Sequence, residues 1–237
     1  MKELLVILFI SYATFSSSQE SEIEKNWSGN FDLGLNLTKN IEQTFQLNNI
    51  FNLNYKTQHH TVSINNNIAF ISKTGQEELL NKGTQDLKYE LVSKKLNIGI
   101  SFQNLYDLSR NIKNRYTTGI GVSYSFLKKK NIKLGLMAQR EKENVLEGNS
   151  KLQNRLNSNI LFSKKIKESI QITLRNSYQP NIEYFGDFRW LSNISLRVNL
   201  STKFLLSINT TYNYDSNPEI GIPEADYQLI NSISYSF

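Results

Sequence analysis

The chain has 237 residues, of which 39% are hydrophobic and 11% aromatic, and it carries a formal net charge of +6. It contains no cysteine, which excludes disulfides, thiolate metal sites, a cysteine nucleophile and a lipidated cysteine anchor. The aromatic content, with only 3 prolines, favours strands over helices, and no window beyond the first two dozen residues is long and apolar enough for a membrane helix.

The N-terminus, residues 1–18, is predicted to be a secretory signal peptide. Lys2 gives a weakly positive start, a short apolar run follows, and three consecutive serines ending at Ser18 suit a cleavage site. The alternative is a buried N-terminal helix. With cleavage near Ser18, residues 19–25 form a short lead and residues 26–237 form one β-domain.

Apolar and polar residues alternate from residue 26 to the end, which is the period-two pattern of β-strands. In the first segment, for example, Phe31 and Leu33 share one face, and Asp32 lies on the other. The apolar positions of the segments, in chain order, are Phe31, Leu33, Leu35, Leu37; Phe45, Leu47, Phe51, Leu53, Tyr55; Val62, Ile64, Ile68, Phe70; Leu87, Tyr89, Leu91; Leu96, Ile98, Ile100, Phe102; Tyr116, Ile120, Val122, Tyr124, Phe126; Ile132, Leu134, Leu136; Leu152, Leu156, Ile160, Phe162; Ile170, Ile172, Leu174, Tyr178; Phe188, Trp190, Ile194, Leu196, Val198, Leu200; Phe204, Leu206, Ile208, Tyr212, Tyr214; and Tyr227, Leu229, Ile233, Tyr235, Phe237. The pattern predicts about twelve strands of about 10–14 residues each.

The connections between these segments alternate in length, apart from a short first one near 38–42. The short ones lie near 57–59, 93–95, 127–131, 163–167 and 200–203, and the longer ones near 73–84, 105–113, 141–149, 179–186 and 215–224. An antiparallel meander puts alternate connections at opposite ends. This pattern is typical of outer-membrane barrels, which have tight periplasmic turns and longer outside loops. We therefore predict an all-β, transmembrane, antiparallel up-and-down β-barrel in the bacterial outer membrane.

The alternative fold is a soluble secreted β-barrel or sandwich that binds a small ligand inside. Strand length, a strand count above that of a lipocalin, and a nearly charge-free apolar face favour the membrane. Aromatic residues also cluster at the predicted strand ends, as in the girdles of membrane barrels: Tyr55, Phe70, Tyr116, Phe126, Phe162, Tyr178, Trp190, Phe204, Tyr214, Tyr227 and Phe237.

The last strand ends in Tyr235 and Phe237 on one face. A terminal aromatic after alternating apolar residues is similar to the signal by which outer-membrane barrels are recognised for insertion. We predict that Tyr235 and Phe237 form this insertion signal. The expected partners are the barrel-insertion machinery and outer-membrane lipids, and the chain is expected to be a monomer.

The C-terminal stretch "YNYDSNPEIGIPEADYQLINSISYSF" and the mid-chain stretch "YDLSRNIKNRYTTGIGVSYSFL" resemble the domain-of-unknown-function 481 family, which includes salt-induced outer-membrane proteins. Its members close with a Tyr-rich strand, an Asp/Pro loop, an Asp opening the last strand and a terminal Tyr-x-Phe. The matching residues are Tyr214, Asp215, Pro218, Pro223, Asp226, Tyr235 and Phe237, with Arg115, Gly119 and Gly121 in the mid-chain pattern. The resemblance implies an outer-membrane barrel and no established activity.

Charged residues fall in the inward phase of several predicted strands. Arg155, Arg175, Arg189 and Arg197 lie on three consecutive strands and would form one basic wall. Asp86 and Glu90, with Lys88, lie six strands away on the opposite wall. Two interpretations stay open: a water-filled narrow channel with a transverse field, or a flattened barrel sealed by Arg–carboxylate pairs.

Other chemistry finds little support. His59 and His60 lie in a predicted turn, and their spacing does not match a catalytic pair. Several carboxylates in or beside predicted loops could bind divalent cations, but their spacing matches no calcium loop: Glu77, Glu78, Glu141, Glu143, Asp215, Glu219, Glu224 and Asp226. We expect no cofactor, no metal, no nucleic-acid partner and no enzymatic activity; the expected role is structural or that of a narrow passive channel.

Overall fold

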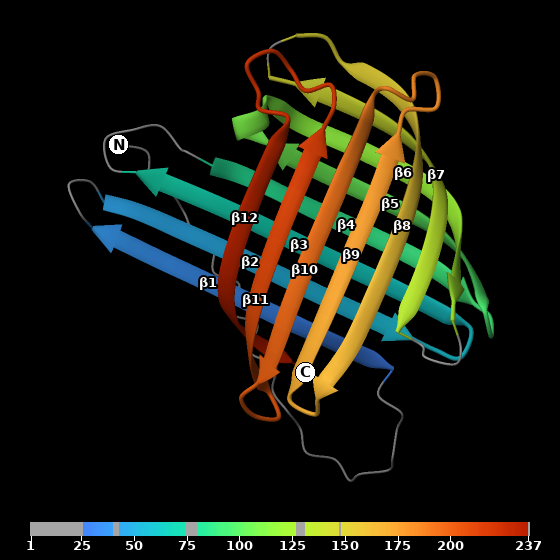
Figure 1. Cartoon of the computed structure of the whole chain (residues 1–237), viewed down its shortest axis with the longest axis vertical. Helices are drawn as coiled ribbons and strands as arrows, with labels where there is room; N and C mark the ends of the chain where they lie inside the picture. The colour runs from blue at the N-terminus through green and yellow to red at the C-terminus, as the bar shows by residue number, and fades with distance from the viewer. Residues whose placement is uncertain (1–25, 40–42, 74–79, 127–130, 147, 237) are drawn as a thin grey trace.

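A computed structural model of the chain describes residues 26–39, 43–73, 80–126, 131–146 and 148–236. Within these residues, twelve strands form one antiparallel sheet that closes into a barrel when β1 pairs with β12 (Figure 1). The strands are β1 (Trp27–Lys39), β2 (Gln43–Lys56), β3 (His60–Lys73), β4 (Leu80–Val92), β5 (Leu96–Asp107), β6 (Ile112–Ser125), β7 (Ile132–Val145), β8 (Lys151–Lys167), β9 (Ile170–Pro180), β10 (Phe188–Asn199), β11 (Phe204–Asp215) and β12 (Ala225–Ser236). The prediction of a twelve-stranded up-and-down barrel is confirmed. The predicted signal peptide and lead, residues 1–18 and 19–25, lie outside the described residues.

Four predicted connections differ from the structure. β4 begins at Leu80, β5 ends at Asp107 and β6 begins at Ile112, so the connections expected at 73–84 and 105–113 are partly strand. The region 141–149 was expected to be a loop, but β7 continues to Val145 and β8 begins at Lys151. The turn expected at 163–167 lies instead at 168–169, because β8 extends to Lys167 with a register irregularity between Lys165 and Lys167. Charged side chains, which suggested loops, are here part of long strands that extend past the apolar band.

The two faces of the barrel differ as a membrane barrel requires. Apolar side chains such as Leu87, Ile98 and Ile120 point outward and are 48%, 49% and 61% exposed. Among the described residues, the buried apolar side chains are few (Ala69, Ile112, Pro180 and Ile230), whereas many buried side chains are polar or charged. A soluble barrel would bury its apolar face in a core. This inverted distribution is that of a barrel whose outer wall meets lipid.

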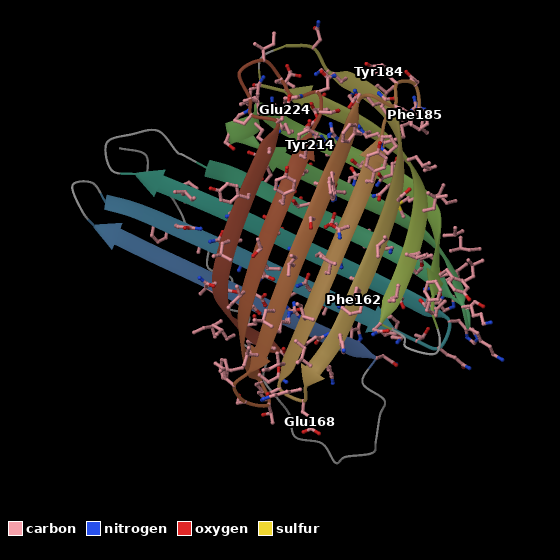
Figure 2. The ribbon with its side chains drawn as sticks, in the orientation of Figure 1. Phe162, Glu168, Tyr184, Phe185, Tyr214 and Glu224 are labelled. Atoms are coloured by element: carbon pink, nitrogen blue, oxygen red, sulfur yellow. The ribbon has the colours of Figure 1, made fainter. Side chains whose placement is uncertain are left out.

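Aromatic side chains lie near both ends of the outer wall. Rings contact each other across neighbouring strands, with centroids 4.7 Å apart for Trp27 and Tyr55 and 5.7 Å apart for Phe188 and Tyr214. Figure 2 shows Tyr214 near one end of the barrel and Phe162 toward the other. Amphipathic rings at two levels are typical of the two membrane–water interfaces.

The helical content of the described chain is one 3-10 turn, η1 (Leu108–Arg110), between β5 and β6. No described helix is long and apolar enough to cross a bilayer. The connections 146–150, 181–187 and 216–224 lie together at one end of the barrel, opposite the β8–β9 and β10–β11 hairpins (Figure 1). This first end is called the mouth below, and it contains the candidate site.

Candidate functional site

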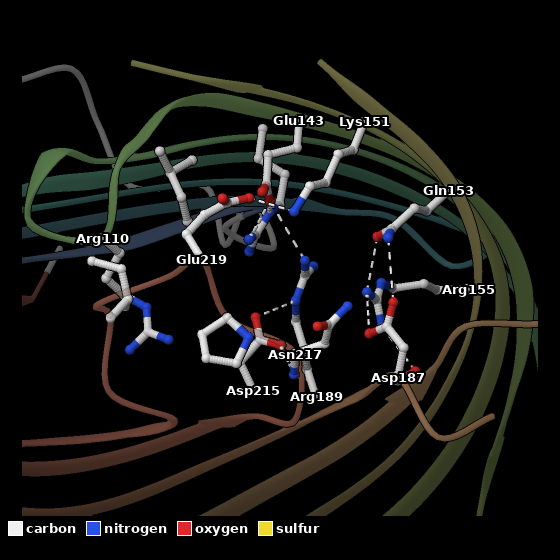
Figure 3. A pocket seen from close by; sticks show the side chains of 14 residues that line it. Arg110, Glu143, Lys151, Gln153, Arg155, Asp187, Arg189, Asp215, Asn217 and Glu219 are labelled. Carbon is white, nitrogen blue, oxygen red and sulfur yellow. Dashed lines mark hydrogen bonds and ion pairs between the residues drawn. The ribbon is translucent and has the colours of Figure 1, made fainter. Parts of the chain in front are cut away.

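Seven charged side chains meet inside the barrel at the mouth, and we call them the mouth cluster; Figure 3 shows its members Glu143, Arg155, Asp187, Arg189 and Asp215. They come from β6, β7, β8, β10, β11 and the β9–β10 connection: Arg115, Glu141, Glu143, Arg155, Asp187, Arg189 and Asp215. Period-two alternation directs the strand members into the lumen, because their neighbours in sequence face outward. Three arginines face four carboxylates, so the formal charge of the cluster is 3 − 4 = −1.

Arg189 on β10 is the centre of the mouth cluster. Its Nη1 donates to both carboxylate oxygens of Glu141 at 2.8 Å, and its Nε donates to Asp215 Oδ2 at 3.0 Å. Its Nη2 lies 3.5 Å from Glu143 Oε2. Arg189 and Glu141 are 7% and 4% exposed. Because Glu141 belongs to β7, three strands away, this pairing spans part of the lumen rather than the sheet surface.

Arg115 completes the carboxylate side of the cluster from β6. Its Nε donates to Glu143 Oε2 at 2.5 Å and lies 3.6 Å from Glu141 Oε1. Glu143 therefore contacts two arginines, and Glu141 contacts these two and Arg155. Charges this deeply buried are stable only when they are paired and hydrogen-bonded, as these are.

Arg155 on β8 is 2% exposed and is held by the β9–β10 connection. Its Nη2 donates to Asp187 Oδ1 at 2.8 Å and to Gln153 Oε1 at 2.9 Å, and its Nη1 donates to the Gln179 carbonyl at 3.0 Å. Its Nε lies 3.8 Å from Glu141 Oε1. These bonds use the fixed geometry of the guanidinium and attach the connection 181–187 to the barrel wall.

The β11–β12 connection, residues 216–224, reaches across the mouth. Glu219 in this connection is ion-paired with Lys151 at the start of β8. At its end, Asp226 on β12 accepts a hydrogen bond at 3.0 Å from Arg110 in η1, almost half-way round the barrel. The space between this connection and the mouth cluster is a small polar cavity, also lined by Pro218 and Ile222 (Figure 3).

Below the mouth the inward charges are sparser. Arg175 on β9 is exposed although it points into the lumen, and Arg197 on β10 is half-buried. Neither has an ion pair among the residues that the structure describes. Arg175 is close enough to Asp86 and Lys88, on the opposite wall, to act on both electrostatically.

Asp86 and Glu90 on β4 have partners on β4, β5 and β7. Asp86 Oδ1 accepts a hydrogen bond from Gln103 at 2.6 Å, and Glu90 Oε1 lies 2.8 Å from Lys133 and 3.1 Å from Lys88. These contacts leave the two carboxylates facing Arg175 without a direct pair to it.

The four arginines predicted to form a basic wall thus divide into two pairs. Arg155 and Arg189 are neutralised within the mouth cluster, whereas Arg175 and Arg197 are not paired with a described carboxylate. Sequence reasoning missed the neutralising residues Glu141 and Glu143, because it assigned them to a loop. The signal was present: Gln139, Glu141 and Glu143 continue the inward phase of β7.

The predicted insertion signal is only partly described. Tyr235 on β12 is 36% exposed and lies opposite Phe31 of β1 and Phe204 of β11, with a centroid distance of 5.6 Å to the Phe204 ring. Phe237 lies outside the described residues. Recognition of these residues by the insertion machinery stays a prediction.

The described residues contain no group of three or more His, Asp or Glu side chains arranged to hold a metal ion. His60, at the start of β3, places its Nδ1 2.8 Å from the Tyr89 hydroxyl, at the end opposite the mouth cluster. The mouth cluster itself supplies fixed, paired charges beside a small polar cavity.

Solved structures with a similar fold are outer-membrane proteins. A KdgM porin in complex with disordered oligogalacturonate is 11% identical, with a TM-score of 0.47, and 89% of this chain aligns with 99% of that one. The NanC porin is 10% identical, with a TM-score of 0.49 and coverages of 87% and 97%. An anion-selective porin from Comamonas acidovorans is 9% identical, with a TM-score of 0.43 and coverages of 89% and 98%.

Comparison with curated proteins gives no match. The model of the family described as "Protein of unknown function, DUF481" matches residues 31–237, which include nearly the whole barrel. The resemblance inferred from the C-terminal and mid-chain stretches is confirmed by this match. The chain belongs to the DUF481 family.

Proposed function

We propose that the chain is a narrow passive channel of the bacterial outer membrane that favours small anions and catalyses no reaction. The mouth cluster is its constriction, and the lumen below is its water-filled vestibule. Lipids surround the apolar wall, and the barrel acts as a monomer.

The observation that carries this proposal is the exposure of Arg175. Its side chain points inward, yet it is exposed, so the lumen has room for water at this level. Twelve strands spaced about 4.8 Å apart and tilted about 40° give a backbone diameter of roughly 24 Å. Inward side chains narrow this space but, beside Arg175, do not fill it.

Charge favours anions over cations in the vestibule. Arg175 and Arg197 are unneutralised by described carboxylates, and Lys88 and Lys133 share the single carboxylate of Glu90. Counting these four cations against Asp32, Asp86 and Glu90 gives 4 − 3 = +1. In a low-dielectric wall, such an excess concentrates anions and repels cations.

A sealed scaffold is the second candidate, and one observation favours it. The Arg110–Asp226 pair crosses the mouth and the connection 216–224 lies over it, so the constriction is filled by protein atoms in this conformation. Conduction then requires passage between the paired charges or a small displacement of that connection.

Planar-bilayer recordings of the purified, folded chain separate the two candidates. The channel predicts discrete conductance steps and a reversal potential on the anion side in a KCl gradient. Replacing the two unpaired arginines, Arg175→Gln with Arg197→Gln, changes the vestibule charge from +1 to −1 and should bring the chloride-to-potassium permeability ratio to one or below.

The matched control is Lys94→Gln with Lys164→Gln, which removes two positive charges from exposed positions, one in the β4–β5 turn and one on the outer wall, and should leave the ratio unchanged. Folding is checked by faster gel migration of unboiled protein. Folded protein that gives no conductance would refute the channel and leave the sealed scaffold.

A further inference from the structure

The outer wall carries a shallow groove over β5, β6, β7 and β8 on the mouth side of the barrel. The groove has a volume of about 750 Å³. Its apolar floor includes Ile100 and Ile120, which are 54% and 61% exposed, and Ala138. Its polar rim includes Arg140 and Asn154. The same concave surface thus combines an apolar strip that can contact hydrocarbon with polar groups that can bind an anion.

Arg140 on β7 lines the groove, and Lys142, further along the same strand, lies just outside it. Arg140 and Lys142 are two residues apart in the outward phase, and both are exposed. Lys142 lies directly opposite Tyr116 of β6 and Leu152 of β8, and Arg140 lies directly opposite Asn154 of β8. Neither cation has an ion pair among the residues that the structure describes, so both are available to an external anion.

The surrounding residues indicate that this level is a boundary between hydrocarbon and headgroups. Tyr116, beside Lys142, is 40% exposed, as expected of an interfacial ring. The β9–β10 connection is attached to β8 by the Ile182 amide, which donates to the Asn154 carbonyl at 2.9 Å. This connection carries Tyr184 and Phe185, 69% and 63% exposed, at the mouth end of the barrel (Figure 2).

We propose that this groove binds a phosphorylated lipid of the outer leaflet. The acyl chains lie on Ile100 and Ile120, and a headgroup phosphate lies between Arg140 and Lys142, with the Asn154 side chain at its edge. Guanidinium and ammonium donors bind phosphate through charge-assisted hydrogen bonds. The site depends on the membrane location proposed above and not on whether the lumen conducts.

Glu183 is the one carboxylate on the rim, and its Oε1 accepts a hydrogen bond at 3.4 Å from the Asn154 amide. Two cations against one carboxylate leave a formal charge of 2 − 1 = +1. The apolar floor distinguishes the ligand from free phosphate, because exposed cations alone hold a small hydrated anion weakly, whereas buried hydrocarbon adds affinity in proportion to its area.

The test is native mass spectrometry of the folded full chain in neutral detergent, with lipid A, with enzymatically dephosphorylated lipid A, or with inorganic phosphate. Wild-type protein should retain lipid A and neither of the other two. Arg140→Gln with Lys142→Gln should lower the retained fraction at least about tenfold, since two charge-assisted contacts are lost.

Lys164→Gln is the matched control, because Lys164 is an exposed cation on the outer wall of β8 at the opposite end. It should retain lipid A as the wild type does, and all variants should keep heat-modifiable gel migration. The site would be overturned if the double variant retained as much lipid A as the wild type, or if the wild type retained as much dephosphorylated lipid A as lipid A. Retention of inorganic phosphate at the same strength would overturn the lipid assignment. A barrel that binds lipid A but does not conduct refutes only the channel.

Discussion

Arg189→Met should destabilise the barrel more than any other single charge removal in the lumen. The guanidinium makes three hydrogen bonds of 2.8 to 3.0 Å to Glu141 and Asp215, and the side chain is 7% exposed. Its loss leaves buried carboxylates uncompensated and changes the cluster charge from −1 to −2. Breaking a buried ion pair by removing one partner costs about 3–5 kcal/mol, and this is the expected loss in the free energy of unfolding.

Urea unfolding of the barrel reconstituted in vesicles measures this loss, as a fall of between about 1 and 3 M in the midpoint. Arg175→Met is the matched control: the same change on the adjacent strand, at an exposed inward position without an ion pair, should cost less than about 0.5 kcal/mol. Adding Glu141→Gln to Arg189→Met should recover part of the loss, because it removes one uncompensated charge. Equal midpoints for the two arginine variants would refute the assignment of Arg189 as the centre of the cluster.

Three further outcomes follow from the geometry. Asp226→Asn removes the ion pair with Arg110 across the mouth and should raise the conductance at low salt. The difference from the wild type should vanish near 1 M salt, where charges are screened within about 3 Å. If the variant and the wild type conduct equally at both salt concentrations, this pair has no role in closure. Deleting Phe237 should lower the membrane yield of the barrel, measured by fractionation and heat-modifiable migration, and an unchanged yield would reduce it to an ordinary strand end. Gly121→Ala should lower the urea midpoint, because a Cβ there would collide with backbone atoms of β7; Gly99→Ala, whose nearest atom would lie 3.0 Å away, should lower it less, and the reverse order would contradict the packing described.

The sequence determined the architecture because each strand of a membrane barrel has a recognisable residue pattern of its own. Outward residues must be apolar and inward residues polar, so alternation alone revealed the strands, and the alternating connections revealed their order. The wrong predictions of strand ends lie where the alternation of apolar and polar residues is weaker. Beyond the apolar band both faces are polar, so the outer part of β7, with Glu141 and Glu143, resembled a loop.

The tertiary structure decided which charges meet. The alternation of residues along each strand placed Arg155, Arg175, Arg189 and Arg197 inward. It gives neither the level of a side chain along the barrel axis nor the stagger between neighbouring strands. The staggered register lets Arg189 reach Glu141 three strands away, and the β9–β10 connection brings Asp187 onto Arg155. Four arginines that all point inward therefore differ in their surroundings: two are buried and neutralised at the mouth, and two are unpaired below it. The reason is that the stagger between the strands of a closed sheet determines which side chains lie at the same level, and no single strand contains that information.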